Sequence, residues 1–214
     1  MSTLAESPGP RGWGPHSIPI DTDGARPVDP GTFRAIMGSL PTGVCVVTAA
    51  DSDGIPRGLT CSAVCSLSQE PPLLLVCVNQ RNQSLAALRA SRGFVVHVLR
   101  EDRGPVSQQF ASGSPDKFTG VPWSASPELG LPLLTSDALA HAECRIAADL
   151  IVGDHTVLVG LIVGGGAPQT GRPLMYWHRG YSNWPDSALP VAALMADFVM
   201  ACGIRSSVTD FSTE

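Results

Sequence analysis

Between residues 43 and 163 the chain alternates short runs rich in β-branched residues with turn residues, and no long helical pattern interrupts it. Strands are predicted at 43–49, 57–67, 73–78, 93–99, 140–152 and 155–163. Asp51 to Gly54 and Gly153-Asp154 have the composition of hairpin turns. Many short strands joined by tight turns favour a mainly β fold, an antiparallel barrel with a few short helices.

The segments on either side of these strands differ in character. Residues 1–28 are rich in Pro, Gly and Ser, and we expect a loose or disordered arm there. Asp29 is a plausible N-cap for a helix that begins at Pro30 and ends at Pro41. Its apolar positions are Phe33, Ile36, Met37 and Leu40. Shorter helices are predicted at 84–90 and 101–110. We expect one domain at 29–184, followed by a C-terminal helix and tail at 185–214.

Composition excludes several classes of protein. The net charge of −5 argues against a nucleic-acid surface. No apolar window is long enough to span a membrane, and the N-terminus lacks the apolar core of a secretory signal, so we expect a cytoplasmic protein. The six cysteines form no C-x-x-C pair and no zinc spacing with histidine, so we expect no metal site and mostly buried free thiols.

The common catalytic motifs are missing too. No G-x-G-x-x-G follows a predicted strand, and no phosphate-binding G-x-x-x-x-G-K-[ST] loop or G-x-S-x-G nucleophile elbow is found. Gly164 to Gly166 are followed by Ala167-Pro168 and are interpreted as a turn or bulge. What remains is a set of polar residues in a β context.

Thr60, Ser62, Ser66 and Ser68 share one parity along the predicted strand 57–67, so their hydroxyls would lie on one face. That face meets solvent, a neighbouring backbone or a polar ligand. Asn79 to Ser84 ends a strand and begins a helix, which suits either a phosphate site that includes Arg81 or a plain capped helix. His155 begins a strand after a tight turn and is either a surface residue or part of a site at the barrel rim. Aromatic residues near the barrel's end either pack or cover a planar ring: Tyr176, Trp177, Tyr181 and Trp184.

Taken in order, these stretches resemble the flavin-reductase-like family, the small reductase components of two-component flavin monooxygenases. The resemblance runs from Phe33 to about Tyr181. Its pieces are Phe33-Arg34, 41–48, Gly58-Leu59-Thr60, 66–73, 76–79, 94–99, Phe110-Ala111, Asp116-Lys117-Phe118, 132–134, 138–140, Gly153-Asp154-His155 and Pro173-Leu174. This chain departs from the family pattern at Ala63 and Val64, where a hydroxyl and an aromatic ring are common.

The resemblance implies an FMN-binding split β-barrel of the Greek-key type. It implies an NAD(P)H:flavin oxidoreductase that moves hydride from NADH, or less commonly NADPH, to FAD or FMN. The reduced flavin then diffuses to a partner flavin-dependent monooxygenase or halogenase. The resemblance also implies a homodimer, since the family's flavin site usually lies against the partner subunit. NADH is preferred because no arginine pair in the sequence marks a 2′-phosphate site, and FAD is preferred from family habit.

The resemblance also implies roles for individual residues. The isoalloxazine and ribityl chain would be lined by Thr60, Cys61, Ser62, Ala63, Ser66 and Leu67. Phosphates would be held by Asn79, Arg81, Asn82 and Ser84, with Phe110 and Lys117 near the nucleotide end of the flavin. His155 would touch the nicotinamide and the flavin edge and act in catalysis. Pro41, Thr42, Gly43 and Tyr181 would border the nicotinamide pocket.

Two other functions remain open at this point. One is a split-barrel oxidoreductase whose flavin stays bound while an organic substrate is turned over. The other is a barrel that binds flavin without catalysis.

Overall fold

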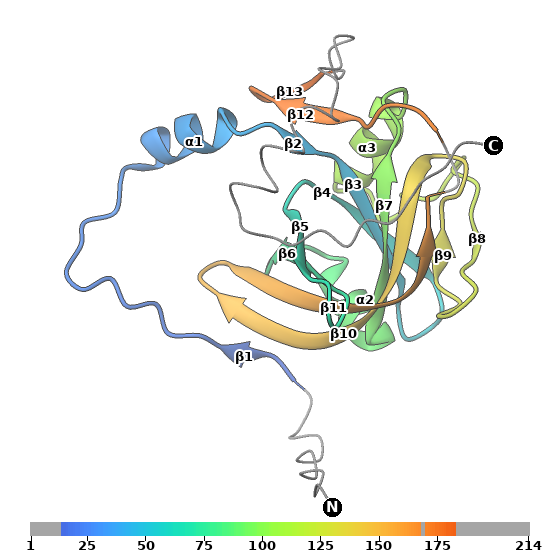
Figure 1. Cartoon of the computed structure of the whole chain (residues 1–214), viewed down its shortest axis with the longest axis horizontal. Coiled ribbons are helices and arrows are strands. Elements are labelled where there is room, and N and C mark those ends of the chain that lie inside the picture. Colours follow the sequence, from blue (N-terminus) through green and yellow to red (C-terminus); the bar gives the residue numbers. More distant parts are fainter. Residues whose placement is uncertain (1–13, 168–169, 183–214) are drawn as a thin grey trace, which may run out of the picture. The chain divides into compact units, whose positions relative to one another are not determined.

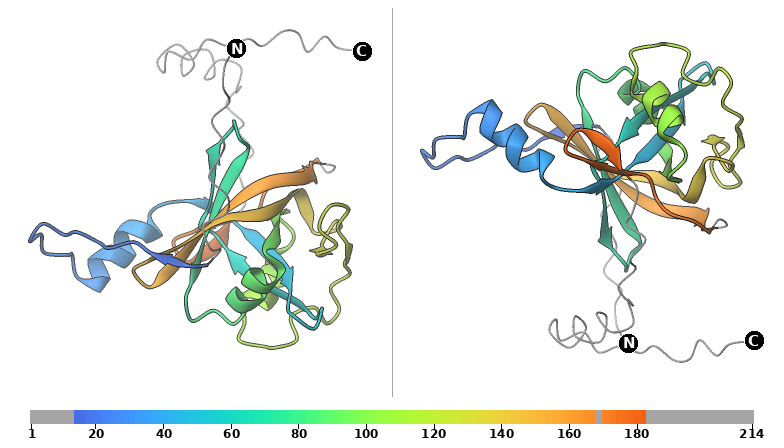
Figure 2. Two further views of the ribbon diagram at one scale, coloured as in Figure 1. Left: turned by 90° about the horizontal axis from the view of Figure 1, so that it is seen from below. Right: turned by 90° about the horizontal axis from the view of Figure 1, so that it is seen from above.

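The predicted strands are nearly all present, and they form one continuous sheet. The computed structural model describes residues 14–167 and 170–182. The main sheet has eight strands in the order β4–β3–β7–β10–β11–β6–β5, with β1 beside β10 (Figures 1 and 2). These strands are β1 (His16–Ser17), β3 (Cys45–Ala50), β4 (Pro56–Cys61), β5 (Val64–Ser68), β6 (Leu73–Asn79), β7 (Gly93–Leu99), β10 (Ala138–Val152) and β11 (His155–Gly166). All neighbours pair antiparallel except β1 and β10, which are parallel.

Smaller elements border this sheet. β2 (Thr42–Gly43) pairs with β12 (Met175–Trp177), which also pairs with β13 (Gly180–Ser182). β8 (Ser124–Ala125) pairs with β9 (Pro132–Leu133). The helices are α1 (Pro30–Gly38), α2 (Leu85–Ser91) and α3 (Gly104–Ala111). The predicted mainly β fold with a few short helices is therefore confirmed.

The single strand predicted at 57–67 is wrong. β4 ends at Cys61 and β5 begins at Val64, so residues 62–63 form a corner between them. β4 and β5 are also the two ends of the strand order, which requires the sheet to curl until its edges approach. No ladder joins β4 to β5 in the described part of the chain, so backbone hydrogen bonds do not close the sheet into a barrel.

The helices follow the predicted signals with small differences. Asp29 caps α1, because its Oδ1 accepts hydrogen bonds from the backbone N–H groups of Gly31 and Thr32 at 2.8 and 3.1 Å. The helix predicted at 101–110 begins only at Gly104, and Pro105 lies in its first turn, a position that suits proline. The glycines interpreted as a turn or bulge end β11, and a register shift against Glu143 and Cys144 lies beside them.

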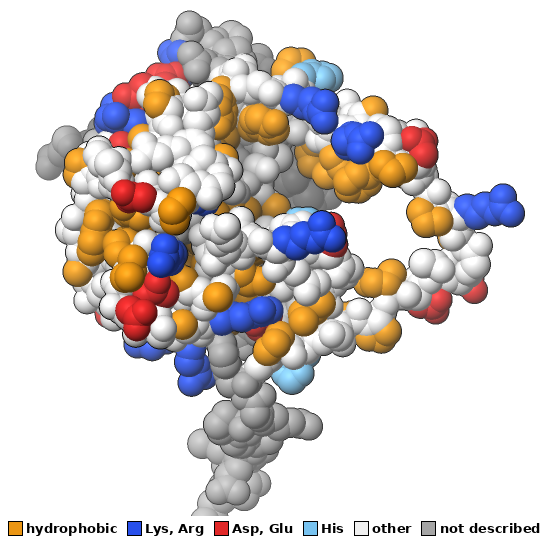
Figure 3. Space-filling view, turned by 180° about the vertical axis from the view of Figure 1, so that it is seen from behind, with side chains coloured by type: hydrophobic (Ala, Val, Ile, Leu, Met, Phe, Trp, Pro, Cys, Tyr) orange, Lys and Arg blue, Asp and Glu red, His pale blue; other side chains and the backbone are white. Residues whose placement is uncertain are grey.

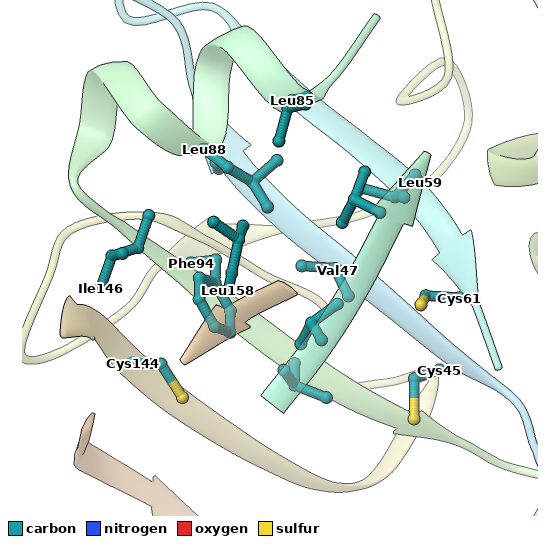
Figure 4. Packing of buried hydrophobic residues seen from close by; sticks show 14 of the residues in the cluster. Cys45, Val47, Leu59, Cys61, Leu85, Leu88, Phe94, Cys144, Ile146 and Leu158 are labelled. Carbon is teal, nitrogen blue, oxygen red and sulfur yellow. The ribbon is translucent and has the colours of Figure 1, made fainter. Parts of the chain in front are cut away.

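The core lies inside the curl of the sheet. Phe94, Leu158, Val47 and Leu88 are fully buried, and α2 lies over this part of the sheet with Leu85 and Leu88 pointing inward (Figure 4). Burying apolar surface is the main favourable term in folding, so this cluster stabilises the curled arrangement. A second cluster, around Phe110 and Leu99, packs under α3.

The cysteines divide by position. Cys45, Cys61 and Cys144 are buried free thiols, as predicted, and Cys77 is half-buried. Cys65 is exposed, because it lies on β5 at the edge of the sheet, where one face has no cover among the described residues. Cys202 lies outside the described residues.

The structure describes part of the predicted N-terminal arm but not the predicted C-terminal helix and tail. Part of the arm is tied down, since β1 pairs with Leu150 and Ile151 of β10 and the Ile18 N–H donates to the Ile151 carbonyl at 2.9 Å. The predicted C-terminal helix and tail at 185–214, and Trp184, lie outside the described residues. No helix in 14–167 or 170–182 combines the length and apolar character needed to cross a membrane.

Candidate active site

The corner between β4 and β5 opens onto a cavity of about 390 Å³, which we call the aromatic pocket. The pocket is lined by Met37, Gly38, Leu40, Thr42, Ser62, Ala63, Val64, Cys65, Leu75, Cys77, Tyr176, Trp177 and Arg179. The corner is fixed by the Cys77 N–H, which donates to the Ala63 carbonyl at 2.9 Å. Three predicted site residues, Thr42, Ser62 and Ala63, therefore meet in one cavity with two large aromatic rings.

Two observations indicate that the aromatic pocket suits a planar ligand. Thr42 lines the pocket, and its hydroxyl is buried without a hydrogen-bond partner among the described residues, so rotation of the side chain would let it bond to a bound group. Tyr176 and Trp177 are exposed, at 38% and 47%, and can cover an aromatic ring. Tyr181, predicted at the same pocket, instead packs edge-to-face on Tyr176 at 5.9 Å and donates its hydroxyl to Ser107 Oγ at 2.9 Å.

The turn after β6 lies against the turn between β10 and β11. Asn79 is directly opposite His155 in the β6–β11 ladder, and the Gln80 N–H donates to the Asp154 carbonyl at 3.0 Å. The side-chain oxygens of Asn79 and Asn82 accept the N–H groups of Arg81 and Ser84, both at 2.9 Å. The two side chains therefore shape the turn and leave the exposed Arg81 side chain as its positive charge.

His155 is partly exposed at this rim, with 44% of its side chain accessible. Its Nδ1 lies 2.7 Å from Oδ1 of Asp154, and this hydrogen bond holds the pKa of Asp154 below its usual value. A carboxylate only accepts hydrogen bonds, so Nδ1 of His155 carries the hydrogen. In the neutral ring Nε2 then has a free lone pair, and Asp154 fixes the orientation of the imidazole.

A second cavity, of about 330 Å³, lies between the start of β4, α2 and residues 114–117, and we call it the basic pocket. It brings together the predicted residues Ser84 and Lys117 and adds Arg57, which the sequence analysis missed. Lys117 Nζ donates to the carbonyls of Gly58 and Phe110 at 3.2 and 2.9 Å, and burial lowers its pKa. Arg57 is paired with Asp51 at 3.0 Å but keeps 34% of its side chain exposed.

Several predicted residues face away from both pockets. Phe110 is fully buried against Phe118 and Gly58, where a Cβ would lie 2.6 Å from the Phe110 ring, so its ring is core rather than ligand surface. The Thr60 hydroxyl donates to the Ser107 carbonyl at 2.6 Å. Cys61 is buried, and burial raises the pKa of its thiol to about 11. Thr60 and Cys61 can therefore contact a ligand only through backbone atoms or the small exposed part of each side chain.

The remaining predicted residues lie on β5, or on β2 and just before it. Gly43 and Ser66 line a third, mostly apolar cavity of about 400 Å³. Leu67 and Pro41 are exposed and line none of these cavities. The corner at 62–63 separates Thr60 from Ser66, so the predicted row of hydroxyls on one strand face does not form.

The two pockets lie at β4 and at the corner that follows it. Gly58 of β4 lines the basic pocket and Ser62 in the corner lines the aromatic pocket, and four residues span at most about 13 Å of extended chain. A ligand with a planar ring at one end and phosphate groups at the other matches this arrangement. The described residues contain no group of His, Cys, Asp and Glu that could hold a metal ion.

Comparisons with known proteins point the same way. Residues 37–185 match the family model described as flavin reductase like domain. The chain is 47% identical to flavin reductase (NADH) of Kitasatospora aureofaciens over 182 residues, which cover 85% of this chain and 95% of the relative. It is 38% identical to the flavin-dependent monooxygenase reductase subunit HsaB of Rhodococcus jostii, covering 78% of this chain and 84% of that protein.

The structure is also similar to a solved reductase. The Streptomyces globisporus NADH:FAD oxidoreductase, solved in complex with NAD and FAD fragments, superimposes with a TM-score of 0.70 at 33% identity. The match covers 77% of this chain and 99% of that one.

Proposed function

Because the chain belongs to the flavin reductase-like family, we propose that it reduces a loosely held flavin with NADH and supplies the reduced flavin to a partner monooxygenase or halogenase. The observation that carries this proposal is the pairing of a basic pocket beside β4 with an aromatic pocket at the corner that follows β4, where the Thr42 hydroxyl has no hydrogen-bond partner among the described residues. Together they fit a flavin whose ring and phosphates lie at opposite ends. The protein would be an oxidoreductase of the EC 1.5.1 type.

The protein contributes binding and orientation to this reaction. The bound nicotinamide and flavin supply the hydride chemistry themselves, which needs no strong acid or base. Ser62, Ala63 and Thr42 would hold the flavin ring, and Tyr176 and Trp177 would exclude water from one side. His155 lines none of the cavities; Asp154 orients its ring beside the Asn79 turn, and we propose that it contacts the bound ligands from this rim. Holding two reactants in register supplies a large part of the rate acceleration.

We assign the phosphates of the flavin to the basic pocket and the Asn79–Ser84 turn. Arg57 and Lys117 line the pocket together with Asp51, which pairs with Arg57, so one positive charge is in excess there. Arg81 adds an exposed charge on the turn. We favour FAD over FMN because the similar Streptomyces globisporus protein is an NADH:FAD oxidoreductase. NADH is favoured as donor because the relative from Kitasatospora aureofaciens carries NADH in its name.

The protein is proposed to act as a homodimer in the cytoplasm. α1 has no buried residue, and three apolar side chains on it, with Leu40 two residues after its end, are about half exposed: Phe33, Ile36 and Met37. A helix of nine residues without a buried face is marginal alone, so a second copy packing on α1 would stabilise it and complete a split barrel. The free thiols fit a reducing compartment.

One experiment tests the reductase function directly. Purified protein is mixed with NADH, and oxidation is followed with and without added FAD or FMN. We expect turnover only with added flavin, and less than one flavin per chain in the purified protein. Stoichiometric flavin that supports turnover of an organic substrate would favour a retained-flavin oxidoreductase. Flavin binding without oxidation of either nicotinamide would favour a protein that binds flavin without catalysis.

A further inference from the structure

Besides the aromatic pocket and the basic pocket, the structure has another polar cavity, which has no role in the function proposed above. It is a cavity of about 280 Å³ between α1 and the turn of the β12–β13 hairpin, which we call the arginine cavity. It is lined by Gly31, Arg34, Ala35, Gly38, His178 and Arg179. Figure 3 shows blue and pale blue side chains gathered beside orange ones on this part of the molecule. Two arginines that are far apart in the sequence therefore share one hollow.

The hairpin turn that carries Arg179 is held against the end of α1. His178 and Arg179 are the two central residues of the β12–β13 turn, and their φ angles of 47° and 65° are those of the tight turns that hairpins favour. The His178 N–H donates to the Gly38 carbonyl, and Trp177 Nε1 donates to the Ser39 carbonyl, both at 3.1 Å. These two hydrogen bonds hold Arg179 near the helix that carries Arg34.

The two positive charges have no negative partner. Neither Arg34 nor Arg179 forms an ion pair within 14–167 or 170–182, and no carboxylate lines the arginine cavity. Asp29, at the start of the same helix, uses its carboxylate to cap α1. Two guanidinium groups facing one cavity repel each other unless an anion lies between them. Arginine forks match the geometry of phosphate oxygens and often bind them in pairs.

The arginine cavity adjoins the aromatic pocket, since Gly38 and Arg179 line both. From the cavity, its charges and this shared wall, we infer that Arg34 and Arg179 bind a phosphate group of the nicotinamide dinucleotide whose ring enters the aromatic pocket. The inference rests on the proposed function. It gives the hydride donor an anchor of its own, separate from the basic pocket that serves the flavin.

Two phosphate sources are possible on the donor: the pyrophosphate, which NADH and NADPH share, and the 2′-phosphate, which only NADPH carries. The test compares the wild type, Arg34→Ala, Arg179→Ala and the double variant with saturating FAD. KM is measured for NADH, NADPH and reduced nicotinamide mononucleotide. Loss of one charged contact raises KM about tenfold, and loss of both raises it about 100-fold. The matched control is Arg145→Ala, an exposed arginine on β10 that lines none of the cavities.

The pattern across donors identifies the phosphate. An increase for both NADH and NADPH, with the KM for FAD unchanged, indicates the pyrophosphate. An increase for NADPH alone indicates the 2′-phosphate. Reduced nicotinamide mononucleotide, which has neither the pyrophosphate nor the 2′-phosphate, should lose less affinity than NADPH in either case. The wild type should also lose more affinity for the dinucleotide at high salt than the double variant does. Unchanged KM values for both dinucleotides in the double variant overturn the inference.

The design separates this inference from the proposed function. If the wild type oxidises neither donor, the reductase function fails, and equilibrium binding of NAD⁺ and NADP⁺ to the wild type and the double variant still tests the arginine cavity. Weaker binding of either dinucleotide to the double variant supports it. Equal binding of both, or none by the wild type, contradicts it. Unchanged melting temperatures exclude misfolding, and Arg34→Lys with Arg179→Lys should recover part of the affinity because the charge is kept.

Discussion

His155 is the residue that most directly tests the proposed mechanism. Asp154 fixes its ring at the rim, and its pairing with Asn79 places it beside the turn proposed to hold flavin phosphate. For His155→Ala we expect kcat to fall about tenfold or more, because the edge of the stacked rings loses a positioning contact. The KM for flavin should change little. Steady-state kinetics with NADH and FAD measure both.

His16→Ala is the control for this substitution. His16 is exposed on β1 and pairs with Leu150 rather than with the Asn79 turn, so its loss should leave kcat and both KM values unchanged. If His155→Ala turns over like the wild type, His155 has no part in the site.

His97 should make stability depend on pH. Its buried ring donates from Nδ1 to the Val46 carbonyl at 3.0 Å and accepts the Leu134 N–H at Nε2, at 3.1 Å. Burial lowers its pKa to about 4, from an ordinary value of 6.5. Between these values the unfolded chain binds more protons, so the free energy of unfolding falls as pH falls. We expect a loss of about 2 kcal/mol between pH 7 and pH 5.

Urea unfolding at pH 7 and pH 5 measures this loss. His97→Gln removes the titrating group, so the variant should be less stable at pH 7 but should lose less stability between the two pH values. Carboxylates that titrate in the same range remain in both proteins and cancel in the comparison. Equal pH dependence in the two proteins would show that His97 is not the cause.

At the scale of elements, the sequence predicts the features that depend on neighbouring residues but misses the corner between β4 and β5. The Asp29 cap, the strand at 93–99 and the long hairpin around Gly153 depend on neighbouring residues, which a sequence displays directly. The break at residues 62–63 has no glycine or proline to mark it. It arises because β4 and β5 lie at the two opposite edges of the curled sheet, so the chain must bend between them. That bend is a property of the whole sheet.

The exposed face of α1 predicts an assembly. Its row of apolar side chains is covered by nothing in the described part of the chain. For Phe33→Asp with Ile36→Asp we expect the homodimer to dissociate, because each charge would have to lose its water at the interface. Size-exclusion chromatography with light scattering, over a dilution series, measures the molar mass.

Ala90→Asp is the control, since Ala90 is exposed on α2 and lies outside the apolar row. The control should stay dimeric. A wild type that is monomeric at all concentrations would contradict the dimer, and the apolar row would then need another occupant.

The basic pocket predicts which flavins bind well. Arg57 lines it beside Lys117 and retains an exposed surface despite its pairing with Asp51. For Arg57→Ala we expect the KM for FAD to rise about tenfold, since one charge-assisted phosphate contact is lost. Riboflavin, which has no phosphate, should bind wild type and variant alike and serves as the internal control. An equal effect on FAD and riboflavin would mean that Arg57 acts on folding or on the ring instead.

At the scale of the molecule, the candidate site is assembled from residues that no sequence window contains together. Ser62 and Ala63 come from the β4–β5 corner, Thr42 from β2, and Tyr176 and Trp177 from β12. A family pattern can name some of these residues in advance. It did not name the Arg34 and Arg179 pair, because their proximity arises only when β12–β13 folds against α1. Long-range contacts of this kind require the fold to be known.

The positions of these residues also predict how the product leaves. The proposed flavin contacts lie at the molecular surface, with His155 at 44% exposure and Ser62 exposed, so the flavin should exchange with solvent during turnover. We place the protein, NADH and FAD under anaerobic conditions on one side of a membrane that passes flavin but not protein, with ferricytochrome c on the other side. Reduced flavin should cross and reduce the cytochrome at a rate that rises with FAD concentration. Rapid NADH oxidation with no cytochrome reduction, while chemically reduced FAD crosses freely, would mean that the flavin stays on the protein and that electrons leave by direct contact.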